Sequence, residues 1–199
     1  MLDRYFFRLG DTEVGPTQSP MRIIPEWRGA SPPAPPSGFA IASVKGCDIA
    51  PINLADAEAA LRLKAYVWPD AGERMARIDA AIALATQQPP DLVAADAGDF
   101  AAAMLARKPQ PGTARVMFHS IMWQYMPAAT QARITAAFAA EGAAATPDTP
   151  LGWIALETDP ATFRHELRVR LWDGAGHRGE ERLLSHAHPH GAWVEWLVD

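Results

Sequence analysis

Strand-forming runs alternate with helical stretches along this chain, and three of the runs end in a charged or titratable side chain. Residues 43–48 and 92–96 end in Asp48 and Asp96, and residues 114–119 end in His119. An open α/β sheet binds its ligand at the carboxyl ends of its strands. The pattern therefore predicts an α/β fold in which these three side chains line one crevice.

Capping and stop signals place the first two helices. Asn53 or Asp56 is a suitable N-cap for a helix that Pro69 ends. Asp70 and Glu73 have the spacing of a capping box and begin a second helix, which Pro89 and Pro90 terminate. We expect a short Ala-rich helix over residues 99–107 before the strand that ends at His119.

The last third of the chain has a different sequence pattern. Pro127 begins a helix that reaches Gly142, and a strand follows over residues 151–157. Residues 166–172 alternate charged and apolar side chains with period two, and residues 182–187 and 192–198 are also strand-like. This part predicts an antiparallel end to the sheet.

The length of 199 residues suits a single α/β domain over residues 1–199. Within it, residues 1–38 are irregular and end in a proline-rich connector over residues 31–37, which favours an extended conformation. Residues 39–199 form the predicted core of sheet and helices. A short strand over residues 21–24 is the clearest element that we expect before the connector.

Composition excludes several classes of function. A net charge of −5 and a sequence pI near 5.7 give no general attraction to nucleic acid or to anionic membranes. Cys47 is the one cysteine, so the sequence has no internal disulfide and no paired-cysteine metal site. No apolar run is long enough for a membrane span or a signal peptide. We expect a cytoplasmic protein.

Asp48 and Asp96 have two possible roles. A carboxylate at the end of a second strand accepts hydrogen bonds from ribose hydroxyls in nucleotide-binding α/β folds, and an acid one strand later can accept a proton from the exocyclic amine of adenine. The two residues together therefore fit an adenosine. Each also fits the simpler role of a turn former or a helix cap.

His119 is the candidate catalytic residue. Its imidazole titrates near neutrality and can take a proton from a nucleophile. Ser120, Trp123 and Tyr125 follow it and are candidates for contacts with the substrate. The alternative is a structural histidine bonded to a backbone carbonyl, with the aromatic residues in the core.

His186, His188 and His190 form a second candidate site. Alternate residues of a strand share one face, so three imidazoles at this spacing can hold a metal ion. Pro189 interrupts the strand, and no acidic residue lies within the cluster. A turn that packs beside Trp193 is the simpler interpretation, so we assign no metal ligand.

Several motifs are distinctive, namely residues 46–54, 66–70 and 116–120, together with Glu26-Trp27-Arg28-Gly29 and the closing segment 186–196. These motifs resemble a bacterial family of uncharacterised proteins, a domain of unknown function, and the similarity extends from Leu2 to the end. In outline this family is similar to class I S-adenosylmethionine-dependent methyltransferases, which implies a Rossmann-like, mostly parallel sheet flanked by helices.

The resemblance also implies roles for individual residues. Asp48 corresponds to the ribose acid, Asp96 with Ala97 to the adenine side of an S-adenosylmethionine pocket, and His119 to a residue beside the transferred methyl group. Longer relatives carry a first strand and a glycine-rich turn before the segment that matches Leu2–Tyr5. We therefore expect that this chain is truncated at its N-terminus.

Three functional hypotheses follow. The first is a methyltransferase-like enzyme with an unknown substrate. The second is a non-catalytic α/β interaction module, or a truncated remnant that has lost the cofactor pocket. The third is a metal-dependent hydrolase that uses His186, His188 and His190. The sequence indicates neither the substrate nor the oligomeric state.

Overall fold

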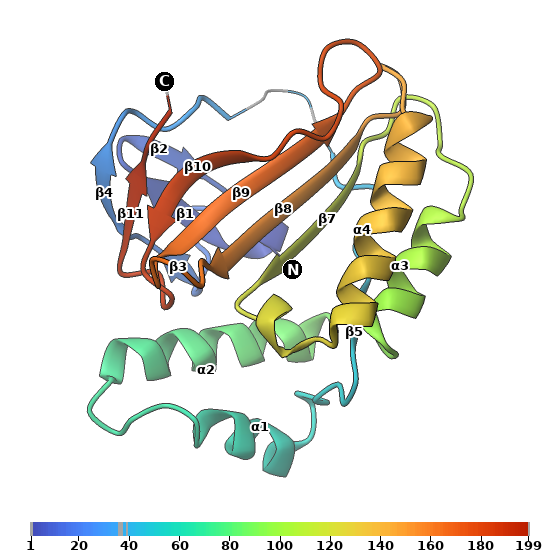
Figure 1. The fold of residues 1–199 in the computed structure, drawn as a ribbon. Helices are drawn as coiled ribbons and strands as arrows, with labels where there is room; N and C mark the ends of the chain where they lie inside the picture. The colour runs from blue at the N-terminus through green and yellow to red at the C-terminus, as the bar shows by residue number, and fades with distance from the viewer. Residues whose placement is uncertain (1, 36–37, 39, 199) are drawn as a thin grey trace. The chain divides into compact units, whose positions relative to one another are not determined.

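The computed structural model describes residues 2–35, 38 and 40–198. The chain divides into two compact units (Figure 1). Unit 1 comprises Met1–Ile24 and Pro32–Ala95, and unit 2 comprises Pro25–Ser31 and Asp96–Asp199. The boundary that the sequence suggests at residue 38 stays a prediction, as does the assignment of one domain.

Unit 1 contains a small three-stranded sheet near its start. Its strands are β1 (Phe6–Leu9), β2 (Thr12–Val14) and β3 (Arg22–Ile23), in the order β2-β1-β3. The first two form an antiparallel hairpin, and Gly10 at its turn has a φ of 59°, a conformation that glycine adopts at no steric cost. A short 3-10 helix, η1 (Leu2–Arg4), precedes β1.

The rest of unit 1 pairs a second, two-stranded sheet with two helices. The strands β5 (Gly46–Asp48) and β6 (Leu92–Ala94) are parallel, and the helices α1 (Ala57–Lys64) and α2 (Gly72–Gln87) lie between them in the sequence. Asp56 caps α1, because its carboxylate accepts hydrogen bonds from the first backbone N–H groups of the helix.

Unit 2 is built on one six-stranded sheet with the order β4-β11-β10-β9-β8-β7. The pairs β7/β8 and β4/β11 are parallel, and the three pairs between them are antiparallel. The elements of unit 2 are β4 (Glu26–Gly29), α3 (Ala97–Leu105), β7 (Arg115–Ser120), η2 (Trp123–Tyr125), α4 (Ala128–Ala143), β8 (Leu151–Thr158), β9 (His165–Trp172), β10 (Arg182–Ala187) and β11 (Trp193–Trp196).

Helix α4 connects the parallel strands β7 and β8 and packs on the sheet near them (Figure 1). Ile134, Phe138 and Gly142 repeat every four residues and are buried on one face of the helix. A side chain at Gly142 would come within 2.4 Å of the Trp172 ring, so the glycine lets α4 approach β9 closely. The core consists of Ala101, Leu105, Ile134, Phe138, Leu151, Trp153 and Trp172.

The α/β class is confirmed, but the predicted Rossmann-like, mostly parallel sheet is wrong. The largest sheet is mixed and mostly antiparallel, and the other two parallel pairs, β1/β3 and β5/β6, belong to two separate small sheets of unit 1. The prediction failed because it joined all strand-like runs into one sheet. Strand neighbours depend on long-range pairing, which the local pattern of a run does not encode.

The strand that we predicted over residues 39–48 is much shorter in the structure. Only β5 forms a ladder, while Ile41 and Val44 are each 49% exposed and belong to no strand. Phe39 lies outside the described residues, as do Pro36 and Ser37 of the predicted connector, and residues 31–35 form no helix or strand. No helix in the described residues has both the length and the apolar character that a membrane crossing requires.

Candidate functional site

A row of titratable side chains crosses five strands of the unit 2 sheet. Glu157 of β8 pairs with Glu166 of β9, Glu166 with His186 of β10, His186 with Glu195 of β11, and Glu195 with Arg28 of β4. Residues directly opposite one another on paired strands project from the same face of a sheet. We call these five residues the polar row.

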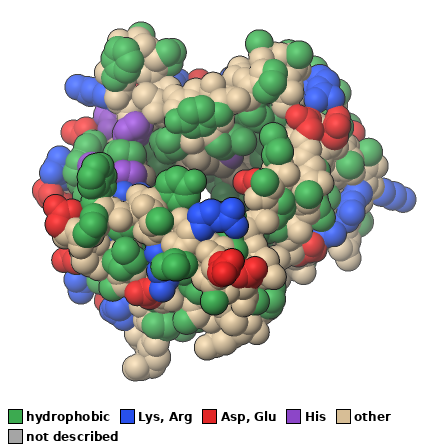
Figure 2. All heavy atoms as spheres, turned by 90° about the horizontal axis from the view of Figure 1, so that it is seen from below, with side chains coloured by type: hydrophobic (Ala, Val, Ile, Leu, Met, Phe, Trp, Pro, Cys, Tyr) green, Lys and Arg blue, Asp and Glu red, His purple; other side chains and the backbone are tan. Residues whose placement is uncertain are grey.

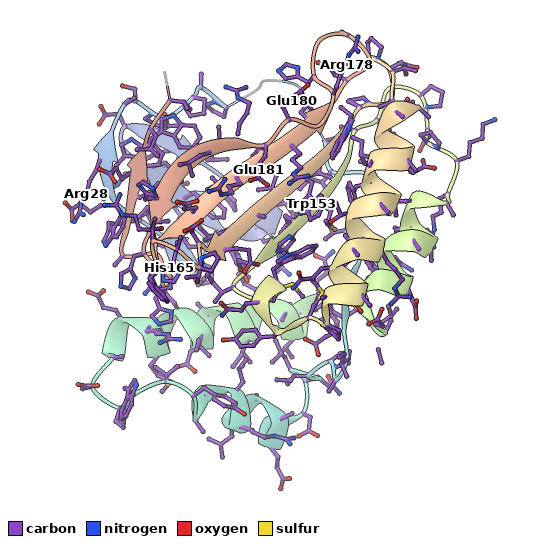
Figure 3. All side chains as sticks on the ribbon, viewed as in Figure 1. Arg28, Trp153, His165, Arg178, Glu180 and Glu181 are labelled. Atoms are coloured by element: carbon purple, nitrogen blue, oxygen red, sulfur yellow. The ribbon has the colours of Figure 1, made fainter. Side chains whose placement is uncertain are left out.

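The polar row lies on the same sheet face as the apolar core. Leu151, Trp153 and Glu157 occupy alternate positions of β8, and alternate residues of a strand share a face. Leu151 and Trp153 pack against α3 and α4 in the core cluster. In Figure 3, Trp153 lies beside α4, whereas Arg28 lies at the other side of the sheet by β4. Along this face of the sheet, the side chains thus change from the apolar core beside α4 to charged residues toward β4.

A β-bulge places His186 in the row. Leu183 pairs with Arg168, whereas Ser185 pairs with Leu167, so the register between β9 and β10 shifts by one residue between them. Without this extra residue, Ser185 would lie opposite Glu166. A bulge redirects the side chains that follow it to the other face of the sheet. Here it places the imidazole of His186 on the face of the polar row.

Glu166 is the most buried carboxylate of the row. Its side chain is 7% exposed, and it forms an ion pair with Arg168 on the same strand. The imidazole of His186 lies between two carboxylates, with Nε2 at 3.7 Å from Glu166 Oε1 and Nδ1 at 3.2 Å from Glu195 Oε2. A buried carboxylate, an imidazole and an exposed carboxylate are therefore in line.

Two arginines neutralise part of this negative charge. Arg168 also bonds Glu181 at 2.8 Å, and Arg170 bonds the same carboxylate at 2.8 Å. Burial raises the pKa of Glu181, but the hydrogen bonds and charges of Arg170 and Arg168 outweigh burial and hold the pKa below its ordinary value. Glu181 therefore stays ionised beside the row (Figure 3).

His119 forms a second histidine–glutamate pair on the same face. Its Nδ1 lies 2.7 Å from Glu157 Oε1, and the indole Nε1 of Trp153 lies 2.9 Å from His119 Nε2. Because an indole N–H can only donate, His119 Nε2 accepts its hydrogen bond. The proton of the imidazole is therefore on Nδ1, which donates a hydrogen bond to Glu157. Both ring nitrogens are occupied, and the ring stacks on Trp123 at 5.2 Å.

The backbone after β7 is held in an unusual conformation. Ile121 has a φ of 49°, in the left-handed region that β-branched residues rarely adopt. Its N–H donates to Leu156, and the next N–H, of Met122, donates to both oxygens of Glu157 at 3.1 Å. Such strain persists only when the surroundings fix it, and it is concentrated at functional sites.

The acids that we predicted from the sequence have local structural contacts. Asp96 is the N-cap of α3, and its Oδ1 accepts from Gly98 N and Asp99 N and pairs with Arg133 at 2.8 Å. Asp48 belongs to unit 1 and accepts from Ala50 N in a turn. These contacts match the simpler roles that the sequence left open, and a shared adenosine pocket stays a prediction.

The other predicted site residues lie in different surroundings. Ala97 is the first residue of α3, and Ser120 projects from the sheet face opposite His119, because neighbouring strand residues alternate. Trp123 packs on His119, whereas Tyr125 is 76% exposed. The structure therefore brings Trp123 to His119 and directs Ser120 away from it. Their predicted contacts with a substrate remain untested.

The three histidines of the candidate metal site do not share one set of contacts in the described structure. His186 joins the polar row, whereas His188 Nδ1 accepts a hydrogen bond from His190 N in the turn after β10. Within residues 2–35, 38 and 40–198, no group of three or more metal-ligating side chains is arranged to hold an ion.

Sequence reasoning missed most of the polar row. We used the alternation of residues 166–172 only to predict a strand, and we did not single out Glu157, Glu166 or Glu195. The signal was present in the alternation of residues 166–170, where every second side chain is charged. The bulge in β10 had no signal of its own in the sequence.

The fold and the row define an α/β protein with a charged, partly buried cluster on one sheet face. A family model described as "Uncharacterized protein conserved in bacteria (DUF2332)" matches residues 1–196. The chain belongs to this family, as its motifs indicated. Neither the curated proteins nor the solved structures gave a significant match.

Proposed function

We propose that unit 2 binds a small organic amine on the polar row, and that His186 and Glu166 exchange a proton with it. The observation that carries the proposal is the position of His186 between the buried Glu166 and the exposed Glu195. An imidazole that titrates near neutrality is a suitable proton donor and acceptor.

The charge of the surface supports an amine over an anion. Arg168 and Arg170 are outnumbered by acidic side chains on this face, and Arg28 is paired with Glu26 at 2.8 Å. An excess of carboxylates attracts cations and accepts their N–H groups. The acidic side chains counted here are Glu157, Glu166, Glu181 and Glu195.

The two histidines differ in their availability to such a ligand. His119 Nε2 already accepts the Trp153 indole, so His119 is a positioning residue that holds Glu157 and stacks on Trp123. The Nε2 atom of His186 has its nearest charged neighbour at 3.7 Å, which is longer than a hydrogen bond. His186 is therefore the acid–base group of the proposal.

Nuclear magnetic resonance tests the proposal directly. Ethanolamine, ethylene glycol and acetate are titrated separately into the protein while the ring protons of the histidines are observed. Ethanolamine should shift the His186 signals and leave those of His119 almost unchanged, and Glu195→Gln should weaken the shift. Equal shifts with acetate, or no shift of His186 with ethanolamine at any concentration, would contradict the proposal.

S-Adenosylmethionine and methyltransferase activity stay predictions. The cofactor carries an ammonium and a sulfonium group, so its charge suits the polar row. The residues that the resemblance assigned to it fit less well, because Asp96 Oδ1 already accepts two backbone N–H groups and pairs with Arg133. We therefore derive no reaction step through this cofactor.

Calorimetric titration with S-adenosylmethionine separates these possibilities. Asp96→Asn keeps a capping side chain on α3 but removes its negative charge. Heat of binding that this variant abolishes would support the residues inferred from the sequence, whereas heat that Glu195→Gln abolishes would place the cofactor on the polar row. Absence of heat with the unmodified chain would exclude the predicted cofactor.

A further inference from the structure

Two arginine–tryptophan contacts accompany the polar row within the described residues. The guanidinium of Arg170 lies 5.5 Å from the ring centroid of Trp153, and that of Arg28 lies 4.9 Å from the ring centroid of Trp193. These are cation–π contacts, in which the negative face of the ring attracts a positive charge. Trp153 is 7% exposed and belongs to the core. Trp193 is only half-buried, so its ring is the one within reach of a ligand.

Trp193 lies next to the exposed end of the polar row. Trp193 and Glu195 are alternate residues of β11 and therefore share a face of the sheet. Glu195 pairs with His186 of β10 and with Arg28 of β4. The rings of His188 and Trp193 meet edge to face, with centroids 6.3 Å apart. In Figure 2, several histidine side chains gather at the surface beside hydrophobic ones. A carboxylate, two imidazoles and an indole thus lie close together.

The other tryptophan of β11 has a different kind of partner. Trp196 packs on Trp27 of β4 with ring centroids 5.8 Å apart, and the indole of Trp27 donates to the carbonyl of Ala30 at 2.7 Å. This pair of rings is part of the packing between the two strands. The ring of Trp193 instead meets a guanidinium and an imidazole. Strand β11 therefore provides one indole for packing and one for a cation.

Arg28 is held mainly by a residue of its own strand. Its Nε and Nη2 donate to the two carboxylate oxygens of Glu26, at 3.0 and 2.8 Å, and its side chain is 45% exposed. The pKa of Arg28 is raised chiefly by these hydrogen bonds, and the charge of Glu195 contributes. Because Glu26 keeps its charge paired, the guanidinium can leave the ring of Trp193 at little cost.

We propose that the amine bound by the polar row is a tertiary amine with methyl groups on its nitrogen, and that it replaces Arg28 on the ring of Trp193. This inference rests on the proposed function, because it names the class of amine at the same site. Methyl groups on a cationic nitrogen suit an indole face better than strongly hydrated N–H groups do. The one remaining N–H donates to Glu195 and supplies the proton that His186 exchanges.

Nuclear magnetic resonance titration with three ligands tests the inference: ethanolamine, N,N-dimethylethanolamine and choline. The dimethyl compound should bind roughly fivefold more tightly than ethanolamine, because its methyl groups contact the indole. Nuclear Overhauser effects should connect these methyl groups with the ring protons of Trp193. Choline should bind more weakly than the dimethyl compound, because its nitrogen carries no N–H to donate.

Three variants identify the residues involved. Trp193→Leu should remove the advantage of the dimethyl compound over ethanolamine, and Trp193→Phe should keep part of it. Arg28→Gln should raise the affinity for the dimethyl compound roughly two- to fivefold, since the internal cation no longer competes for the ring. Trp68→Leu is the matched control and should leave the advantage unchanged, because Trp68 is 76% exposed but belongs to unit 1.

The outcomes separate this inference from the proposed function. If ethanolamine shifts the His186 signals but methylation of the nitrogen brings no gain in affinity, the inference is overturned and the proposed function stands. The inference is also overturned if choline binds at least as tightly as the dimethyl compound, or if Arg28→Gln weakens binding of the dimethyl compound. If none of the three ligands shifts the His186 signals, the proposed function fails and this inference fails with it.

Discussion

The two histidine–glutamate pairs of unit 2 stand on one sheet face and have opposite environments. His119 is enclosed by Trp153 and Trp123 at the end that α3 and α4 cover, and each of its ring nitrogens has a hydrogen-bond partner. His186 lies farther along the face, between Glu166, whose side chain is 7% exposed, and Glu195, whose side chain is 46% exposed. The same two residue types thus support the core in one place and form the proposed acid–base pair in the other.

The difference comes from what surrounds each imidazole. An indole donor fixes the tautomer of His119 and occupies its remaining acceptor nitrogen, which makes the ring part of the packing. Carboxylates surround His186, and they accept protons as well as hydrogen bonds. Prediction of a catalytic histidine from its position at a strand end cannot distinguish these cases, because the partners come from other strands.

The largest expected effect is at Trp153, the residue that encloses His119. Trp153→Ala should lower the free energy of unfolding by about 3–5 kcal/mol, since it removes a buried ring that packs on Phe138 at 5.0 Å. Trp153→Phe keeps much of the ring and should cost about 1–2 kcal/mol for the lost indole donor. Urea denaturation measures both. Equal losses for the two variants would show that the hydrogen bond to His119 matters more than the packing.

The comparison predicts a smaller but unequal effect for the histidines themselves. His119→Ala should cost about 2–3 kcal/mol, because it leaves the Trp153 indole without its partner and leaves Glu157 with the Met122 N–H but without the imidazole donor. His186→Ala should cost about 1 kcal/mol, since Glu166 keeps its ion pair with Arg168. Denaturation of the two variants under identical conditions is the measurement, and equal destabilisation would remove the distinction between them.

The smallest effect concerns the dependence of stability on pH. The pKa of Glu181 is lower in the folded chain than its ordinary value of 4.5. The contribution of Glu181 to the free energy of unfolding is therefore complete above pH 4.5 and is lost as the pH falls through the folded pKa. Between about pH 5 and pH 3, the melting temperature of Glu181→Gln should fall less than that of the unmodified chain. Thermal melts at several pH values test this. Parallel curves for the two proteins would show that the arginines do not stabilise the ionised form of Glu181.

The sequence predicted individual elements better than their arrangement. Residues 182–187 form β10 as expected, and the helix between Pro127 and Gly142 corresponds to α4. Both follow from local signals, namely a strand-like run for β10, and Pro127 at the start and Gly142 near the end of α4. The parallel pairing of β5 with β6, and of β7 with β8, depends on contacts between distant segments, and the predicted sheet was wrong because it joined these two pairs into one sheet.

The candidate site was predictable in the same partial way. His119 was identified because a histidine ends a strand-like run, and the structure places it on the sheet face that carries the polar row, although with both nitrogens occupied. His186 was noticed for its spacing to His188 and His190. This spacing proved unrelated to the side chains that contact His186. Its true partners, Glu166 and Glu195, are set by a bulge and by the order of strands. Neither is visible in a single segment of sequence.

The position of β4 at one edge of the unit 2 sheet has a consequence for synthesis. This strand belongs to the first 30 residues of the chain, yet it pairs with β11, which is among the last. During translation β4 leaves the ribosome long before β11 and stays unpaired until β11 has also been made. Pairing across so long a loop is intrinsically slow, so assembly of unit 2 ends with the attachment of its earliest strand.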